Sequence, residues 1–133
     1  MSSPNNPHTG PIPDPLPVHI YKIIPDEPPS PLPAEWPLSD LDRNDGFIHF
    51  STAKQIPITA SLYFKDTTNL WIFKLPFRPF ADKIRWEVPH TDGCPHLYGA
   101  NFGAADVLDV RGFQRGDGQG WKEVLGGEAW LEH

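Results

Sequence analysis

The chain has 133 residues, enough for one domain with a buried core. Its 11 basic and 17 acidic residues give a formal net charge of −6, which argues against a surface built to hold a nucleic-acid backbone. Cys94 is the single cysteine, so no internal disulfide can form, and neither a secretion signal nor an apolar run of membrane-spanning length is visible. We therefore expect a cytoplasmic protein without membrane contact.

Proline is concentrated near the N-terminus, where twelve of the 17 prolines fall within the first 37 residues. Because proline lacks an N–H group and disfavours helices, residues 1–16 are predicted to form a mobile tail, and residues 17–133 a single domain. The second Pro-rich stretch, "PDEPPSPLPAEWP", is predicted to be an ordered, extended loop. No Lys or Arg directly flanks a PxxP motif here, which argues against a polyproline ligand for a partner protein.

The first elements in chain order are two strands separated by that loop. "VHIYKII" (residues 18–24) alternates and ends at a proline, as a strand does. "AEWPLSDLDRNDG" offers at most a helical turn followed by a polar turn. In the second strand, "GFIHFS", the period of two places Phe47, His49 and Ser51 on one face and Ile48 and Phe50 on the other.

A helix is expected next, within "TAKQIPITASLYFKD". Ala53, Ile56, Ala60 and Phe64 recur at spacings of three and four, which indicates one apolar helix face. Proline breaks a helix interior but fits the first turn, so the main helix is predicted to begin at Pro57. Ser51 or Thr52 could supply the cap at its start.

The remaining elements are short strands and a final apolar segment. "NLWIFKLPF" is almost continuously apolar, which is typical of a central strand covered on both faces, and "KIRWEV" alternates cleanly. "PHLYG" and "ADVLDVRGF" supply two more strands, and a short segment follows around residues 121–125. The predicted fold class is α+β, with mainly antiparallel sheets, about six strands and one or two short helices.

Chemically capable side chains recur at strand positions where a core needs none: His49, Ser51, Glu87, His96 and Tyr98. Each has a purely structural interpretation, as a hydrogen-bonded core histidine, a helix cap, a solvated acid or a packed ring. Together they predict a concave cleft that takes a small-molecule ligand.

Two other chemistries are open to these residues. His49, His90, His96 and Glu87 could ligate zinc, but their spacing fits no compact zinc motif, so no metal is expected. Cys94 and His96 would share a strand face, which permits a Cys–His nucleophile, although a buried inert thiol is the commoner case.

Five stretches carry a resemblance to a known family: "IYKI", "DGFIHFSTAKQI", "LWIFKL", "IRWE" and "PHLYG". In this order, from Val18 to Phe113, they resemble the bacterial and fungal family called domain of unknown function 952. That family is grouped by distant similarity with the ADP-ribosyltransferase fold. The same fold contains RNA 2′-phosphotransferases, whose His-x-His-hydrophobic-Ser strand is similar to "FIHFS".

The resemblance implies a cleft of the ADP-ribosyltransferase type, with NAD lying as substrate between two small antiparallel sheets. His49 would bind ribose or phosphate, and Glu87 would stabilise the oxocarbenium ion that develops on the ribose, so these two are the catalytic candidates. Tyr98 would stack on the nicotinamide. The ligand-binding candidates are Lys22, Ser51, Thr52, Trp86, His96 and Tyr98. Lys22 departs from the pattern, since many enzymes of this fold carry His or Arg there.

Three functions stay open at this point. The first is an NAD-consuming ADP-ribosyltransferase or NAD glycohydrolase that uses Glu87, and the second is a non-catalytic nucleotide- or metabolite-binding module. A metal-dependent hydrolase is the third. The position of Glu87 discriminates between the first two, because the enzyme hypothesis requires its carboxylate to face the same cleft as His49.

Overall fold

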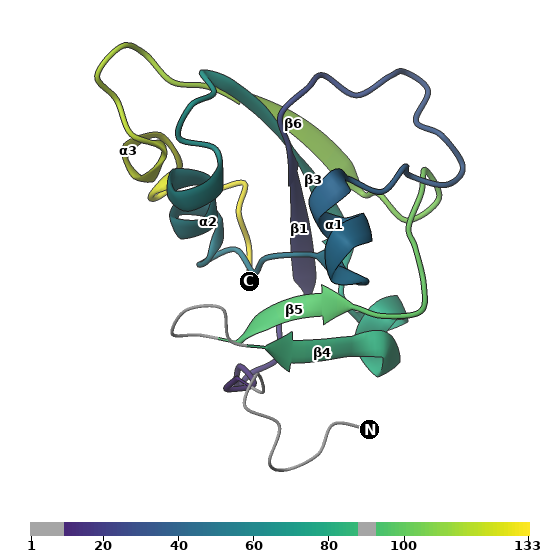
Figure 1. The fold of residues 1–133 in the computed structure, drawn as a ribbon. Helices are drawn as coiled ribbons and strands as arrows, with labels where there is room; N and C mark the ends of the chain where they lie inside the picture. The colour runs from purple at the N-terminus through teal and green to yellow at the C-terminus, as the bar shows by residue number, and fades with distance from the viewer. Residues whose placement is uncertain (1–9, 88–92) are drawn as a thin grey trace.

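The computed structural model describes residues 10–87 and 93–133. Two three-stranded antiparallel sheets form its framework (Figure 1). The first sheet has the order β1-β3-β6 and consists of β1 (His19–Ile24), β3 (Asn69–Pro76) and β6 (Asp109–Gln114). The second has the order β2-β5-β4 and consists of β2 (Ile48–His49), β5 (Cys94–Leu97) and β4 (Ile84–Glu87).

Short helices surround the sheets: α1 (Asp40–Asp45), α2 (Ile56–Tyr63), α3 (Trp121–Leu125) and a 3₁₀ helix (Arg78–Lys83). The predicted α+β class with antiparallel sheets is confirmed. The described residues hold more short helices than the one or two expected, because "SDLDRNDG" forms a complete helix with two caps. The Ser39 hydroxyl accepts the Asp42 N–H at its start, and Gly46 ends it at φ 80°.

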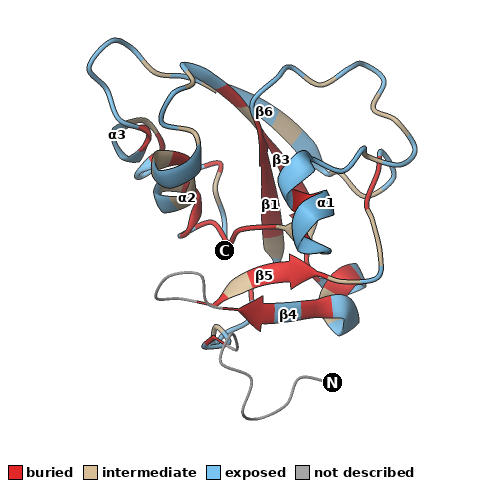
Figure 2. Cartoon of the chain, viewed as in Figure 1, coloured by how far each residue is buried: buried red, intermediate tan, exposed pale blue. Residues whose placement is uncertain are grey.

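The β1-β3-β6 sheet lies between two apolar clusters, as the red segments of β1 and β3 in Figure 2 indicate. On one face, Leu70 and Ile72 of β3 pack with residues of α2 and α3. On the other face, Phe73 and Leu75 pack with residues of the second sheet, such as Leu97. This arrangement confirms β3 as a central strand covered on both faces.

Helix α2 begins at Ile56 with Pro57 in its first turn, as predicted. The predicted cap by Ser51 or Thr52 is wrong, because Gln55 is the N-cap residue and makes no side-chain cap. Its amide instead joins two segments, accepting the Thr52 N–H and donating to the Gly93 carbonyl.

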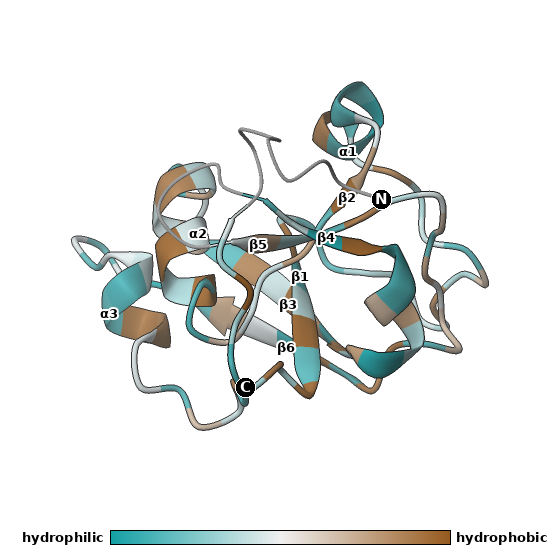
Figure 3. Ribbon diagram, turned by 90° about the horizontal axis from the view of Figure 1, so that it is seen from below, coloured by the Kyte–Doolittle hydropathy of each residue, from teal (hydrophilic) through white to brown (hydrophobic). Residues whose placement is uncertain are grey.

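The α2 helix is hydrophobic on more than its buried side, as its brown bands in Figure 3 show. Ile56 and Ala60 are completely buried, whereas Ile58 and Leu62 are exposed. None of the described helices is both long and apolar enough to cross a membrane.

The described part of the Pro-rich head contacts the domain. Gly10 is buried, and its N–H donates to the Trp86 carbonyl at 2.8 Å. The Pro15 carbonyl accepts a hydrogen bond from the His133 ring at 2.9 Å. The boundary at residue 16 between a tail and a domain stays a prediction.

Candidate functional site

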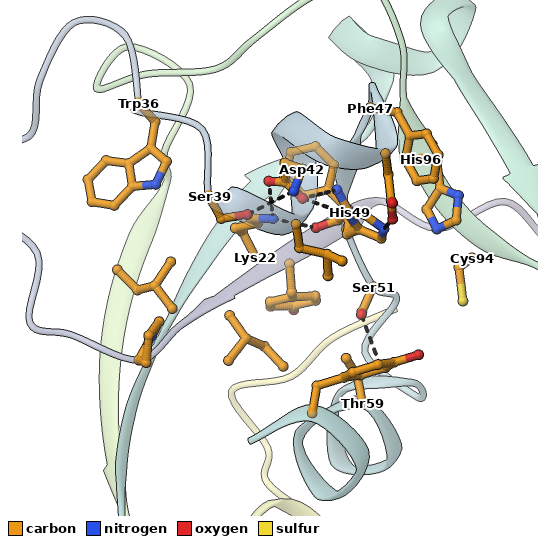
Figure 4. Close-up of a pocket in the computed structure, with 18 of the residues that line it drawn as sticks. Lys22, Trp36, Ser39, Asp42, Phe47, His49, Ser51, Thr59, Cys94 and His96 are labelled. Carbon is orange, nitrogen blue, oxygen red and sulfur yellow. Dashed lines mark hydrogen bonds and ion pairs between the residues drawn. The ribbon is translucent and has the colours of Figure 1, made fainter. Parts of the chain in front are cut away.

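A cavity of about 890 Å³ is lined by β1, the loop that follows it, α1, β2, α2 and the ends of β4 and β5. Trp36 and His96 lie at opposite sides of this cavity, with the polar residues of α1 and β2 between them (Figure 4). Of the eight predicted site residues, six line this cavity: Lys22, His49, Ser51, Glu87, His96 and Tyr98. The structure therefore supplies the concave site that the strand pattern predicts.

The alternation of the second strand places its polar face in this cavity. Ile48 and Phe50 are each only 2% exposed and belong to the core between the sheets, whereas Phe47, His49 and Ser51 line the cavity. Beyond β2, the backbone of Ser51 pairs with Tyr21 of β1 through hydrogen bonds of 2.8 and 2.9 Å. That pair joins the two sheets at the floor of the cavity.

Glu87 and His96 meet across the β4–β5 ladder at the end of the cavity opposite Trp36. Glu87 Oε1 lies 2.8 Å from His96 Nδ1 and accepts a 2.6 Å hydrogen bond from the Tyr98 hydroxyl. Because a carboxylate accepts, Nδ1 must carry a proton, and in neutral His96 this leaves Nε2 as the acceptor nitrogen. Burial lowers the pKa of His96, although the Glu87 hydrogen bond opposes that effect. Burial and the Glu87 bond both raise the pKa of Tyr98.

His49 lies between two carboxylates of α1. Its Nδ1 is 2.6 Å from Asp42 Oδ1, and its Nε2 is 3.0 Å from Asp45 Oδ2. Both carboxylates accept, so making both contacts at once requires a proton on each ring nitrogen, which is the imidazolium form. A ligand that binds His49 Nε2 must therefore share this nitrogen with the Asp45 carboxylate or displace that carboxylate.

Lys22 and Asp42 form a buried ion pair beneath His49. Lys22 Nζ lies 2.6 Å from Asp42 Oδ2 and also donates to the His49 carbonyl at 3.0 Å. Burial lowers the pKa of Lys22, with Asp42 opposing the shift. For Asp42, burial acts to raise the pKa, but the His49 hydrogen bond and the Lys22 charge outweigh it and lower the pKa to about 2. The pair fixes α1 against β1.

Aromatic rings cover the space between the two histidines. The centroid of the Phe47 ring lies 4.6 Å from that of His49, 4.3 Å from that of His96 and 4.9 Å from that of Tyr98. The Arg85 guanidinium lies over the Tyr98 ring, 4.3 Å from its centroid. Phe47 thus contacts both histidines and Tyr98.

Two predicted ligand-binding residues do not reach the cavity. Trp86 is 8% exposed and packs against Phe77 in the core between the sheets. Thr52 is 3% exposed and lies outside the lining. Ser51 does line the cavity, where its hydroxyl lies 3.2 Å from that of Thr59 (Figure 4).

Asp42, Asp45 and Phe47 contribute to the site but were not among the predicted site residues. A signal for Asp42 exists in the sequence, since Lys22 interrupts an apolar strand and a buried ammonium needs a carboxylate partner. Nothing local identifies which acidic residue it is, because Asp42 lies 20 positions further along the chain.

The zinc alternative includes His90, which lies outside the described residues. Within residues 10–87 and 93–133, no group of three His, Cys, Asp or Glu side chains is placed to hold a metal ion. Cys94 lines the cavity together with His96. A metal-dependent hydrolase and a Cys–His nucleophile both stay predictions.

Similar proteins were found by sequence profile and by structure. The profile of the family described as "Protein of unknown function (DUF952)" matches residues 33–110. The crystal structure of CC0527 from Caulobacter crescentus is 27% identical, with a TM-score of 0.61 over 74% of this chain and 89% of that protein. The solution structure of CC0527, at 22% identity and a TM-score of 0.60, agrees in fold. No curated protein matches. Since the profile covers more than half of its length, the chain belongs to the DUF952 family.

Proposed function

We propose that the cavity binds the ribosyl-nicotinamide part of NAD and that Glu87 promotes cleavage of the bond between ribose and nicotinamide. The chain would then be an ADP-ribosyltransferase or an NAD glycohydrolase. One observation carries the proposal: Glu87, held by His96 and Tyr98, lines the same cavity as His49. The volume of about 890 Å³ is within the range of small-molecule sites.

The chemistry follows from the charge of Glu87. When the bond from ribose C1′ to nicotinamide breaks, its electron pair leaves with nicotinamide and positive charge develops on the ribose. An oriented carboxylate stabilises that charge more than it stabilises the ground state. Water or an acceptor hydroxyl then adds to C1′ and releases a proton, for which the acceptor nitrogen of neutral His96 is available.

The alternative is a non-catalytic binding module in the same cavity. The observation that favours it is that the polar groups already satisfy one another. Both ring nitrogens of His49 contact carboxylates, and Glu87 Oε1 accepts two hydrogen bonds. A ligand would then bind by replacing some of these contacts, with no bond broken.

Calorimetric titration with NAD and an assay of nicotinamide release test the proposal on the wild type, Glu87→Gln and His49→Ala. Gln keeps the shape and the hydrogen bonds of Glu87 but removes its charge. We expect the chemical step to slow by about 10²–10³ while affinity changes little. His49→Ala should instead weaken binding, because its contacts are to parts of the ligand whose charge stays constant.

Glu123→Gln is the matched control, since Glu123 is an exposed carboxylate on α3 outside the cavity lining. Binding of NAD without nicotinamide release by the wild type would establish the binding module instead. If nicotinamide release by Glu87→Gln equals that of the wild type, Glu87 does not stabilise the reacting ribose.

A further inference from the structure

The two carboxylates that contact the His49 ring are held to different degrees. The Asp42 side chain is only 3% exposed and pairs with Lys22 at 2.6 Å as well as with His49 (Figure 4). The Asp45 side chain is 40% exposed, and its ion pair with His49 Nε2 at 3.0 Å is the one polar contact of its carboxylate within residues 10–87 and 93–133. Exposed ion pairs contribute little to stability, so Asp45 is the carboxylate that can leave.

Asp45 occupies a position where helix stability does not favour an acid. It is the last residue of α1, and Gly46 ends that helix. The carbonyl groups at a helix C-terminus carry partial negative charge, which disfavours a carboxylate there. No atom lies within 4 Å of the place that a Cβ of Gly46 would take, so the turn beside Asp45 is open. The favourable interaction of Asp45 is thus its contact with His49, and not one with its own helix.

Without Asp45, the three remaining charges would form a site for an anion. The Lys22 ammonium and the Asp42 carboxylate compensate each other, which leaves the charge of the His49 imidazolium. Asp42 would still hold Nδ1, so the Nε2–H of His49 would be a charged donor in the cavity, and such donors bind oxyanions strongly. The present contact shows that an anionic oxygen fits 3.0 Å from Nε2.

The other carboxylates of the lining do not compete for this nitrogen. They are Asp26, Glu27 and Glu87, and within the described residues none of them pairs with His49. Glu87 accepts hydrogen bonds from His96 and Tyr98 instead. Asp26 and Glu27 are exposed, so water and salt screen their charges. These charges weaken the attraction of an anion to the cavity, but among the described residues only Asp45 occupies the donor that would bind it.

We infer that the Asp45 carboxylate stands in for a phosphate oxygen at His49 Nε2 and is displaced when a phosphate-bearing ligand binds. The inference rests on the proposed function for the identity of that ligand, NAD, and assigns His49 to the phosphate next to the nicotinamide-side ribose. Asp45 is then an internal competitor of the ligand. Although it lines the cavity, its removal should tighten binding, and the gain should be confined to ligands that carry a phosphate.

Calorimetric titration with ADP-ribose tests the inference, because this probe has both phosphates of NAD but no bond to nicotinamide. We expect Asp45→Asn to bind ADP-ribose about two- to fivefold more tightly than the wild type, the range that loss of an exposed ion pair allows. Nicotinamide riboside, which has no phosphate, should not bind more tightly to the variant. Asp40→Asn is the matched control on the same helix, since Asp40 pairs with Arg43 outside the lining, and should leave both affinities unchanged.

Glu27→Gln separates competition at His49 from a general change of charge. It removes an exposed lining carboxylate that does not pair with His49, so ADP-ribose affinity should rise by less than about twofold. A gain equal to that of Asp45→Asn overturns the inference, and so does an Asp45→Asn variant that binds ADP-ribose no more tightly than the wild type.

Nicotinamide release from NAD distinguishes these failures from failure of the proposed function. Release by the wild type without a gain of affinity in Asp45→Asn overturns the inference alone. Tighter ADP-ribose binding by Asp45→Asn without any release supports the inference and overturns the proposed reaction. If neither protein binds ADP-ribose and neither releases nicotinamide, both are overturned.

Discussion

Glu87 and His49, which line the cavity, are each held by a partner from another element. Glu87 of β4 is bound by His96 of β5, and His49 of β2 is bound by Asp42 of α1. Such bonds fix the rotamer and the tautomer of a histidine, which is what a site needs before a ligand arrives. The same contacts shift the pKa of His96 and of Asp42.

The titration of His96 reports this coupling. Burial places its pKa below the usual 6.5, and Glu87 acts in the opposite direction. Replacing Glu87 with Gln should therefore lower the pKa of His96 further, as followed by NMR of the imidazole protons. Tyr98→Phe, which keeps the Glu87 charge, is the control and should not lower it. A rise of the His96 pKa in Glu87→Gln would contradict the contact as described.

The lowered pKa of His96 also makes the stability of the fold depend on pH. Because the folded-state pKa of His96 is depressed, the unfolded chain binds the proton more readily. The contribution of neutral His96 to stability is complete above pH 6.5 and declines as the pH falls below it.

Elements with a clear period could be predicted from sequence, and contacts between elements could not. The alternation of Phe47, His49 and Ser51 fixes which side chains face the cavity, because a strand has only two faces. Helix α1 and its Asp42 were missed, since six residues of polar sequence give no apolar period. Trp86, predicted to bind the ligand, lies in the core on the strand face opposite Glu87, as its own alternation indicates.

The loop between β1 and α1 forms one wall of the cavity and is secured by close backbone packing. The Trp36 N–H donates to the Phe102 carbonyl, and the Ala104 N–H to that of Pro33. Gly103 lies between these bonds, where a Cβ atom would overlap the carbonyl of Ala34. Only a residue without a side chain fits there.

Gly103→Ala should therefore lower the free energy of unfolding by about 1–3 kcal/mol, measured by urea denaturation. The matched variant is Gly120→Ala, because a Cβ at Gly120 has no neighbouring atom within 4 Å and its φ of −95° suits any residue. It should cost less than about 1 kcal/mol. Equal stability of the two variants would show that the wall yields to the added methyl group.

For the molecule as a whole, the buried ion pair connects the helix that carries the site to the sheet that carries the core. Lys22 lies on β1 within an apolar strand, and Asp42 is its partner on α1. Removing one member of a buried pair leaves the other charge without compensation. The pair thus links global stability to the geometry around His49.

Asp42→Asn should lower the free energy of unfolding by about 3–5 kcal/mol in urea denaturation at pH 7. Asp40→Asn on the same helix is the control, because Asp40 pairs with Arg43 at the surface, and should change it by less than about 1 kcal/mol. The pKa of Asp42 is lowered to about 2, so its stabilisation holds above the usual value of 3.8 and is lost as pH falls toward 2. A control variant as unstable as Asp42→Asn would contradict the role of the pair.

The backbone pair between Tyr21 and Ser51 has a consequence for the local stability of the cavity floor. It consists of two hydrogen bonds, whereas β1 is joined to β3 along six residue pairs. Local opening follows the weakest cooperative unit, so the floor of the cavity can separate while both sheets stay folded. The amide hydrogens of Tyr21 and Ser51 should then exchange with solvent faster than those of the β1–β3 ladder, as hydrogen-exchange measurements would show.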